Sequence, residues 1–445
     1  MPLAGLPIGK RSALLLDKEN MTKYSISPMS SLYELYLRHP RISTDSRRIE
    51  PDSVFFALRG ASFDGNRFAA DALEKGAAYA VVDDPSLPNT RPDKADRLIV
   101  VDDALQTLQT LAREHRRELG LPILAITGSN GKTTTKELVS RVLAEKYEVY
   151  ATRGNLNNHI GVPLTLLAMT RDVEFGIVEM GASACGEIAL LCSIAEPNYG
   201  IVTNIGRAHL EGFGGPEGVR RGKGELYDWL ARTGGRVFVP ANDPVLMSMA
   251  AERETLAAEC YPTTLADGVE HHLEGDYNRF NVAAAVAVGR YFGVDDIRYA
   301  VGSYRPDNHR SQKIRTGQNT LILDCYNANP SSMQASLVNF RQEPLESCTR
   351  KILILGDMLE LGDWSDAEHR HIISLAAEIP DARILLVGPH FAKAYRSLES
   401  RPADTTLYPS QEALAAELRK HPVSQALILV KGSHSIGLER LADLL

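Results

Sequence analysis

Short apolar runs, each bounded by polar or glycine residues, recur along most of the chain and are typical of strands. In the first segment, residues 21–118, these runs cover 54–57, 79–82 and 98–101. Leu105, Leu108 and Leu111 then stand at helical spacing. The charged stretch that follows them ends at Gly120 and is expected to be a linker. The pattern therefore predicts a small α/β unit at the start of the chain.

The apolar runs of the remaining chain are separated by helix-sized intervals. In the second segment, residues 119–312, they cover 123–126, 175–178, 200–203 and 237–239. In the third, residues 313–445, they cover 321–323, 352–355, 384–387 and 426–430. This alternation favours two mostly parallel sheets that are covered by helices. Ser365 and Glu368 have the spacing of a capping box, which predicts that a helix opens at Ser365.

Residues 1–20 lack this pattern and are expected to be a disordered extension. The apolar stretch at 12–16 is too short for the hydrophobic part of a signal peptide, and charged residues follow it at once. No apolar run approaches the ~18 residues that a membrane helix needs, so we expect no membrane insertion.

The composition is that of a soluble globular protein: 44% of the 445 residues are hydrophobic, 24% are charged, and the net charge is -7. At ~150 residues per domain, this length suits about three domains. The weak negative charge argues against a broad basic surface for nucleic acid. The five cysteines form no CxxC pair, which argues against a zinc cluster and favours the reducing cytoplasm.

A glycine-rich loop, Thr-Gly-Ser-Asn-Gly-Lys-Thr-Thr-Thr, follows the first apolar run of the second segment. Gly128 and Gly131 let backbone N–H groups turn toward phosphate oxygens, and a helix expected to start near Lys136 adds partial positive charge. Lys132 can neutralise terminal phosphates, and the Thr133 hydroxyl can ligate Mg²⁺. The spacing is the tight GxxGKT, not the common GxxxxGK[ST]. A glycine turn with an incidental lysine is disfavoured, because strand, glycines, Lys-Thr and helix occur in the required order.

This loop is similar to the ATP loop of the Mur ligases, the ATP-dependent amide-forming enzymes of peptidoglycan precursor synthesis. Further motifs that resemble the family follow in order: GNLNNHIGVP at 154–163, VEMGA at 178–182, TNIGRAHLE at 203–211, KGE at 223–225, DCYNANP at 324–330, GDMLELG at 356–362 and KGS at 431–433. The resemblance spans residues 21–445. It implies a three-domain α/β protein with a small N-terminal domain, a central ATP-binding domain on a P-loop-type parallel sheet, and a C-terminal Rossmann-like domain.

The family reaction joins a carboxylate to an amine through an acyl phosphate made from ATP. The motifs at 326–330 and 356–362 resemble those of the member that adds D-alanyl-D-alanine to UDP-N-acetylmuramoyl-tripeptide. The resemblance implies that the N-terminal domain binds the UDP-sugar, the central domain ATP and Mg²⁺, and the C-terminal domain the dipeptide. We expect a cytoplasmic monomer that binds these small molecules and no nucleic acid.

The resemblance also implies the site residues. The ATP-binding residues are Gly128, Ser129, Asn130, Gly131, Lys132, Thr133, Thr134, Asn278, Arg310 and Asp324. The UDP-sugar residues are Ser46, Arg47, Asn155 and Asn157. The amino-substrate residues are Tyr326, Asn327, Asn329 and Lys431. The catalytic residues are Lys132, Glu179, His209 and Lys223. The Mg²⁺ ligands are Thr133, Glu179, His209 and, if it is carbamylated, Lys223.

Simpler interpretations of these residues remain open. Glu179 follows an apolar run and would emerge at the sheet edge where ligands bind, but a strand-end glutamate can also be merely solvated. A lone histidine such as His209 is more often a surface or core residue than a ligand. Lys223 could be an unmodified lysine that neutralises phosphate.

The polar loops also have structural explanations. The asparagines at 155–158 suit an Asx turn, and Asn278 and Asn281 suit a helix N-cap. Arg47 stands close to an aspartate, as in surface salt bridges.

Two other functions stay open. A sister ligase that adds one amino acid, or a folylpolyglutamate synthase, would share most of the motifs, although 326–330 and 356–362 argue against both. A non-catalytic P-loop switch, in which ATP only gates a partner, needs one metal. The set of Glu179, His209 and Lys223 argues against such a switch.

Overall fold

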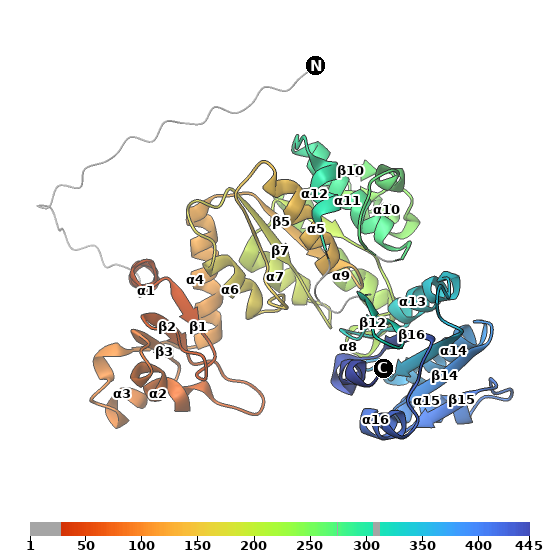
Figure 1. The fold of residues 1–445 in the computed structure, drawn as a ribbon. Helices are drawn as coiled ribbons and strands as arrows, with labels where there is room; N and C mark the ends of the chain where they lie inside the picture. The colour runs from red at the N-terminus through yellow and green to blue at the C-terminus, as the bar shows by residue number, and fades with distance from the viewer. Residues whose placement is uncertain (1–27, 274, 306–311) are drawn as a thin grey trace, which may run out of the picture.

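The computed structural model describes residues 28–273, 275–305 and 312–445. The expected extension at 1–20 and the predicted ATP contact Arg310 lie outside the described residues. The described chain forms three α/β units, each built on a separate sheet (Figure 1). The predicted three-domain α/β fold class is thereby confirmed.

The N-terminal unit is a four-stranded parallel sheet in the order β1-β2-β3-β4. Its elements are α1 (Pro28–Arg38), β1 (Arg41–Ser43), β2 (Ser53–Phe56), α2 (Ala69–Glu74), β3 (Tyr79–Val82), α3 (Leu87–Thr90), β4 (Leu98–Val100) and α4 (Ala104–Leu119). The three predicted strands are confirmed as β2, β3 and β4. The almost fully buried β2 and β3 form the middle of the sheet, as uninterrupted apolar runs predict.

The central unit holds a six-stranded parallel sheet in the order β10-β9-β8-β5-β7-β6. Its strands are β5 (Ile123–Thr127), β6 (Val149–Ala151), β7 (Phe175–Glu179), β8 (Tyr199–Val202), β9 (Arg236–Pro240) and β10 (Ala257–Tyr261). Its helices are α5 (Lys132–Ala144), α6 (Gly161–Leu167), α7 (Glu187–Ala195), α8 (Leu210–Phe213), α9 (Pro216–Thr233), α10 (Pro244–Ala251), α11 (Asn278–Tyr291) and α12 (Ile297–Ser303). The four predicted strands are confirmed as β5, β7, β8 and β9.

The C-terminal unit holds a second six-stranded sheet in the order β11-β12-β16-β13-β14-β15, with only β11 antiparallel. Its strands are β11 (Gln312–Arg315), β12 (Thr320–Asp324), β13 (Arg350–Gly356), β14 (Ala382–Val387), β15 (Thr405–Tyr408) and β16 (Ala426–Lys431). Its helices are α13 (Pro330–Gln342), α14 (Ser365–Ala377), α15 (Pro389–Arg396) and α16 (Gln411–Lys420). The four predicted strands are confirmed as β12, β13, β14 and β16.

Two predicted helix starts need correction. Helix α5 begins at Lys132, one turn before the predicted start, because Gly131 takes a φ of 80° and leads directly from the loop into the helix. Helix α14 does open at Ser365, but the capping box is wrong. Its N-cap is Trp364 and no side chain caps it, while the Glu368 carboxylate is engaged by another unit of the chain.

The predicted linker before Gly120 is also wrong, because the charged stretch is the second half of α4. Its polar residues include two buried side chains that reach the central unit. His115 Nε2 lies 2.8 Å from the carbonyl oxygen of Met169. Arg116 Nε donates to the carbonyl oxygen of Ala195 at 3.0 Å. Helix α4 packs on α1 and β2 of its own unit and on α6 and α7 of the central unit (Figure 1).

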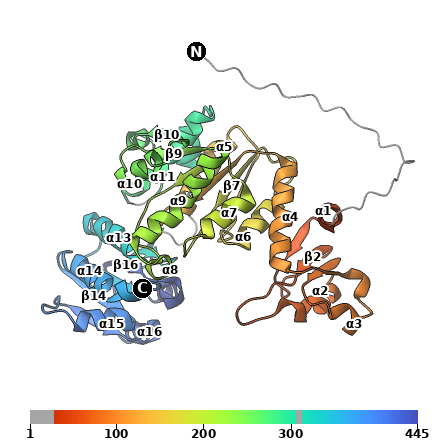
Figure 2. The ribbon, with the colours of Figure 1, turned by 180° about the vertical axis from the view of Figure 1, so that it is seen from behind.

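The three units share one apolar core cluster, which includes Leu108, Val178 and Leu353 from the first, second and third unit. The N-terminal and C-terminal units lie on opposite sides of the central unit (Figures 1 and 2). Within the described ranges, no helix combines the length and the apolar character that crossing a membrane requires.

Candidate active site

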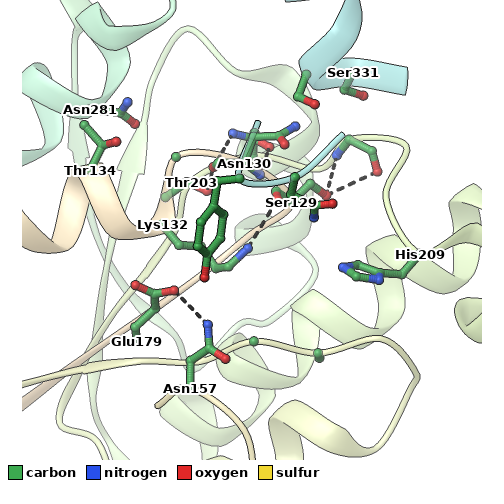
Figure 3. Close-up of a pocket in the computed structure, with 18 of the residues that line it drawn as sticks. Ser129, Asn130, Lys132, Thr134, Asn157, Glu179, Thr203, His209, Asn281 and Ser331 are labelled. Atoms are coloured by element: carbon green, nitrogen blue, oxygen red, sulfur yellow. Dashed lines mark hydrogen bonds between the residues drawn. The ribbon is translucent and has the colours of Figure 1, made fainter. Parts of the chain in front are cut away.

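A cavity of about 860 Å³ lies where the central unit meets the C-terminal unit. Its walls come from the loops after β5, β7, β8 and β12 and from the first turn of α11. These loops follow the carboxyl ends of parallel strands, where open α/β sheets bind ligands. The predicted residues that line the cavity are Ser129, Asn130, Gly131, Lys132, Thr134, Asn157, Glu179, His209, Asn278, Asp324, Tyr326, Asn327 and Lys431 (Figure 3).

The phosphate loop is held rigidly against the loop after β8. The Asn130 N–H donates to Asn204 Oδ1 at 3.1 Å, and the Thr203 hydroxyl donates to the Asn130 carbonyl oxygen at 2.5 Å. Gly128 has a φ of 136°, and a Cβ there would collide with Thr203. Glycine is therefore required for the turn that aims the loop N–H groups at the cavity. Lys132 Nζ donates to the Gly128 carbonyl oxygen at 2.8 Å and lines the same wall.

Glu179 sits at the end of β7 with only 2% of its surface exposed, so the interpretation of a solvated strand end is wrong. The Thr133 hydroxyl donates to Glu179 Oε2 at 2.8 Å. Asn157 Nδ2 donates to the other carboxylate oxygen at 2.8 Å, as Figure 3 shows. Two hard oxygen donors, a hydroxyl and a carboxylate, thus meet beside the phosphate loop, which is the donor chemistry that Mg²⁺ prefers.

His209 faces the cavity from the wall opposite Glu179 (Figure 3). Its backbone is left-handed, with a φ of 53°. Burial lowers the pKa of the imidazole, although the neighbouring Glu360 carboxylate opposes the shift. His209 Nδ1 bonds to that carboxylate, which belongs to the C-terminal unit. The imidazole is therefore held from outside its own unit.

Lys223 lies on α9, behind the cavity wall, with 1% of its surface exposed. Its Nζ donates to the Ala182 carbonyl oxygen at 3.1 Å and lies 5.1 Å from the centre of the Phe213 ring. Among the described residues, no carboxylate forms a salt bridge with it. Burial, reinforced by the charge of Lys132, lowers the pKa of Lys223 to about 7.

Residues at the carboxyl ends of β12 and β16 form the opposite wall. Lys431 Nζ donates to Asp324 Oδ2 at 2.5 Å, and the Ser336 hydroxyl donates to the same oxygen at 2.9 Å. The predicted amino-substrate cation and the predicted ribose acceptor thus neutralise each other. Tyr326 remains 40% exposed and lines the cavity, whereas the Asn327 carbonyl oxygen accepts from Lys431 at 3.3 Å.

Asn329 caps α13 and also reaches the phosphate loop. Its Oδ1 accepts the N–H of Ser332 at 2.9 Å in a capping box, and its Nδ2 donates to Asn130 Oδ1 at 2.8 Å. It does not line the cavity. Its bonds therefore tie the C-terminal unit to the phosphate loop.

The asparagines of α11 are not N-caps, because the N-cap is Tyr277. Asn281 Nδ2 donates to Asn278 Oδ1 at 2.8 Å, and Asn281 Oδ1 accepts from the Thr135 hydroxyl at 3.0 Å. This pair locks the start of α11 to the first turn of α5. Asn278 lines the cavity beside the phosphate loop.

The predicted UDP-sugar residues are not gathered at this cavity, with the exception of Asn157. Arg47 lies on the N-terminal unit and donates to Asp45 Oδ2 at 2.8 Å, the surface pair that its sequence setting favoured. The Ser46 carbonyl oxygen accepts from Lys75 at 2.7 Å. Asn155 is exposed, and the Asx turn of this loop is formed by Asn158, which accepts the N–H groups of Ile160 and Gly161.

Sequence reasoning missed Asn204 and Thr203, which close the phosphate loop, and Glu360, which holds His209. All three stand inside the motifs at 203–211 and 356–362. Their position in the sequence could have identified them, since polar residues directly after an apolar strand lie at the ligand-binding edge of a parallel sheet.

Comparison with known proteins agrees with this architecture. Residues 40–116, 126–261 and 309–434 match the families described as "Mur ligase family, catalytic domain", "Mur ligase middle domain" and "Mur ligase, glutamate ligase domain". The UDP-N-acetylmuramoyl-tripeptide–D-alanyl-D-alanine ligase of Bacillus subtilis (strain 168) is 34% identical over 432 residues, which cover 90% of this chain and 92% of the relative. The chain belongs to the Mur ligase family. The Escherichia coli (strain K12) ligase of the same name is 31% identical and covers 90% of this chain and 92% of the relative.

Solved Mur ligase structures share the whole fold. A crystal structure of MurF from Acinetobacter baumannii superposes with a TM-score of 0.79 at 30% identity and covers 91% of this chain and 93% of that one. MurF ligase from Thermotoga maritima in complex with ADP superposes with a TM-score of 0.77 at 25% identity and covers 92% and 97%. The Mur ligase fold of this chain therefore includes all three units in their family order.

Proposed function

We propose that this Mur ligase joins the terminal carboxylate of UDP-N-acetylmuramoyl-tripeptide to the amine of D-alanyl-D-alanine. ATP is converted to ADP and phosphate, and an acyl phosphate is the intermediate. The observation that carries the proposal is that one cavity brings the phosphate loop and Glu179 to face Tyr326 of the C-terminal unit. Relatives that are similar over 90% of the chain carry the name of this activity.

The three units suit three substrates. We assign UDP-sugar binding to residues 21–118, ATP binding to 119–312 and dipeptide binding to 313–445. Ser46 and Arg47, in the turn after β1, would hold the UDP-sugar, and Tyr326 would contact the dipeptide. Since substrates meet across separate units, the cycle requires the units to close on one another.

The nucleotide lies along the phosphate loop in this proposal. The loop N–H groups and the α5 N-terminus would bind the phosphates, and Lys132 would neutralise the γ-phosphate as charge develops there. Thr133 and Glu179 would hold Mg²⁺, which reduces the repulsion between the phosphate and the incoming carboxylate. The bonded hydroxyl–carboxylate pair fits such an ion, although the described residues contain no cluster of three or more His, Cys, Asp or Glu side chains. Phosphate oxygens and water would complete the coordination.

We assign the binding of a second metal ion to His209 and a carbamylated Lys223. A lysine whose pKa is about 7 is largely an uncharged amine at slightly alkaline pH, and only the uncharged amine attacks carbon dioxide. Carbamylation would replace a buried ammonium, which lies close to the charge of Lys132, with an anionic oxygen donor. The unmodified lysine remains the alternative. The enzyme would act as a monomer in the cytoplasm, where thiols stay reduced, consistent with its unpaired cysteines.

The decisive test compares amine substrates, because a sister ligase would accept one amino acid. ADP formation is measured with UDP-muramoyl tripeptide and equal concentrations of D-Ala-D-Ala, D-Ala, L-Ala, D-Glu or a diamino acid. A site built to pair the carboxylate and the peptide group of a dipeptide discriminates by up to ~10⁴–10⁵, so we expect D-Ala-D-Ala to be strongly preferred. Comparable rates with a single amino acid would overturn the substrate assignment. ATP hydrolysis that needs neither acceptor nor amine would instead favour a P-loop switch.

A further inference from the structure

We propose that Glu360 of the C-terminal unit is a positioning residue that orients His209 of the central unit toward the reaction cavity. The second metal site, which the proposed function assigns to His209 and Lys223 of the central unit, would then be complete only when the C-terminal unit contacts the central unit. This inference rests on the proposed function, because it uses the assignment of His209 as a metal-binding residue.

The contact joins two loops that follow strands of different sheets. His209 Nδ1 bonds to Glu360 Oε2, and the backbone of the same loops pairs where the Glu211 N–H donates to the Glu360 carbonyl oxygen at 3.2 Å. Glu360 is therefore hydrogen-bonded to the loop that carries His209 at two points, through its side chain and through its main chain. A chance encounter of an exposed carboxylate with a histidine would not include the second bond.

The backbone around Glu360 is specialised for this reach. Glu360 has a φ of 61°, a left-handed conformation that glutamate rarely adopts. The next residue, Leu361, is 1% exposed and anchors the loop in the core, and Gly362 continues with a φ of 52°. A strained residue next to a buried anchor persists only when the surrounding structure fixes it. Here the fixed conformation carries the carboxylate to His209.

The hydrogen bond determines which ring nitrogen of His209 is available. A carboxylate is only an acceptor, so Nδ1 must carry the proton that it donates to Glu360. The lone pair of the neutral ring is then on Nε2, which has no hydrogen-bond partner among the described residues. Histidines that bind metals are commonly held in this way, with the second nitrogen donating to a carboxylate. His209 lines the cavity and its ring points into it (Figure 3), so the proposal assigns the available nitrogen to the side where the nucleotide phosphates would lie.

Neighbouring contacts show that the two units are held together beside this pair. Arg207 Nη1 donates to Glu368 Oε1 of α14 at 2.8 Å, and the Arg207 N–H donates to the Ser331 hydroxyl at 2.7 Å. Both bonds start at Arg207, which stands two residues before His209 on the central unit. The loop that carries His209 is thus bonded to the C-terminal unit through its main chain and through its side chains. Separation of the units would leave the imidazole without its carboxylate.

The test is a metal titration of the full-length protein. Mn²⁺ is added in the presence of a non-hydrolysable ATP analogue, and free Mn²⁺ is followed by electron paramagnetic resonance. The variants are Glu360→Ala, which removes the acceptor, and Glu360→Gln, which keeps an acceptor oxygen. The matched control is Asp363→Ala, since Asp363 is an exposed carboxylate of the same loop without a described partner. Thermal melting checks that each variant folds.

Loss of a carboxylate behind a metal-binding histidine typically weakens metal binding by ~10–100-fold, and we expect this loss in Glu360→Ala at one of the bound Mn²⁺ ions. Glu360→Gln should remain close to wild type, and Asp363→Ala should match it. Wild-type affinity in Glu360→Ala would overturn the proposal. An equal loss of Mn²⁺ affinity in Glu360→Ala and Glu360→Gln would also overturn it, because the Glu360 carboxylate would then itself be a metal ligand. A similar loss in Asp363→Ala would overturn it too, because it would indicate only a general effect of negative charge.

The titration contains no acceptor and no amine. It can therefore be interpreted even if the assay of amine substrates rejects the proposed reaction. Conversely, if the wild type is an active ligase but Glu360→Ala binds Mn²⁺ normally, the proposed function stands and the positioning role of Glu360 is rejected.

Discussion

Among single side chains, Lys132 is the one to which the proposed function assigns the most direct part in catalysis. It stands at the first position of α5 and faces the cavity from the phosphate loop. Lys132→Ala should lower kcat by ~10²–10³, the usual effect of removing one group that stabilises transition-state charge. The melting temperature should stay near that of wild type, because Lys132 stands at the end of the phosphate loop and donates to the carbonyl oxygens of Gly128 and Ser129 in that loop. Near-wild-type turnover in a folded variant would contradict the assignment of this loop.

Two buried lysines make opposite predictions for stability. Lys223 forms no salt bridge with a carboxylate of the described residues, and its pKa is lowered to about 7, whereas in the unfolded chain this lysine keeps its proton up to about 10.5. Between these pH values the unfolded chain binds more protons, so the stability of the wild type rises with pH. In bicarbonate-free buffer, Lys223→Met should therefore be more stable than wild type by a few kcal/mol below pH 7 and lose this advantage toward pH 10.

Lys431→Met is the matched comparison. Lys431 is as buried as Lys223 but is paired with Asp324, and its removal would leave that carboxylate without its cation. This variant should be less stable than wild type by about 3 kcal/mol or more. Denaturant unfolding at pH 6.5 and pH 9.5 measures both variants. A destabilised Lys223→Met protein at pH 6.5 would mean that this lysine is not held as an unpaired amine.

The sequence located the site residues that belong to one continuous loop better than those that act across units. Lys132 and Glu179 were predictable because a strand end or a glycine loop fixes where the side chain emerges. The pairing of Lys431 with Asp324 and the bond from Asn329 to Asn130 depend on how separate strands and units align in space. No spacing along the chain encodes these contacts.

At the scale of secondary structure, α4 provides a direct test of how the first two units are joined. Arg116 is buried and donates from Nε and Nη2 to the carbonyl oxygens of Ala195 and Glu196 and to Asn198 Oδ1. Arg116→Ala should remove these three bonds across the two units and reduce stability by about 2–4 kcal/mol. Its neighbour Arg117 forms an exposed pair with Glu196, and Arg117→Ala should change stability by less than ~1 kcal/mol. Equal effects in urea unfolding would contradict the bridging role of α4.

The strands that the sequence did not predict share one feature. They are β1, β6, β10, β11 and β15, and each lies at an edge of a sheet. Edge strands are covered on fewer sides, so their residues are partly exposed and their apolar runs are mostly short or interrupted; β15, for example, is half-buried throughout. The edge strand β4 was predicted because its apolar run continues over 98–101. The central strands were predictable because both faces are covered by helices. The linker was wrongly predicted for a related reason, since charged residues of α4 are buried by contacts with another unit.

In the assembled protein, the pair between Arg207 and Glu368 is expected to hold the C-terminal unit against the central unit. Glu368 is buried, and its second carboxylate oxygen has no hydrogen-bond partner in the part of the chain that the structure describes. Arg207→Ala would leave a buried charge unpaired, so the variant should show a larger radius of gyration in small-angle scattering and a KM for the amine raised by roughly 10-fold, equivalent to ~1.4 kcal/mol. The double variant Arg207→Ala with Glu368→Gln removes the buried charge and should recover part of the compaction. No difference between the single and double variants would contradict this explanation.

The shared use of α4 also limits how such proteins can exchange parts. A crossover before Ala104 would separate the helix from the sheet of the N-terminal unit, where Leu108 is completely buried. A crossover at Gly120 would pair α4 with the α6 and α7 of another homologue, in which the acceptors of Arg116 need not lie in the same places. For recombination between homologous genes, the first two units therefore behave as one inherited block, even though each has a separate sheet.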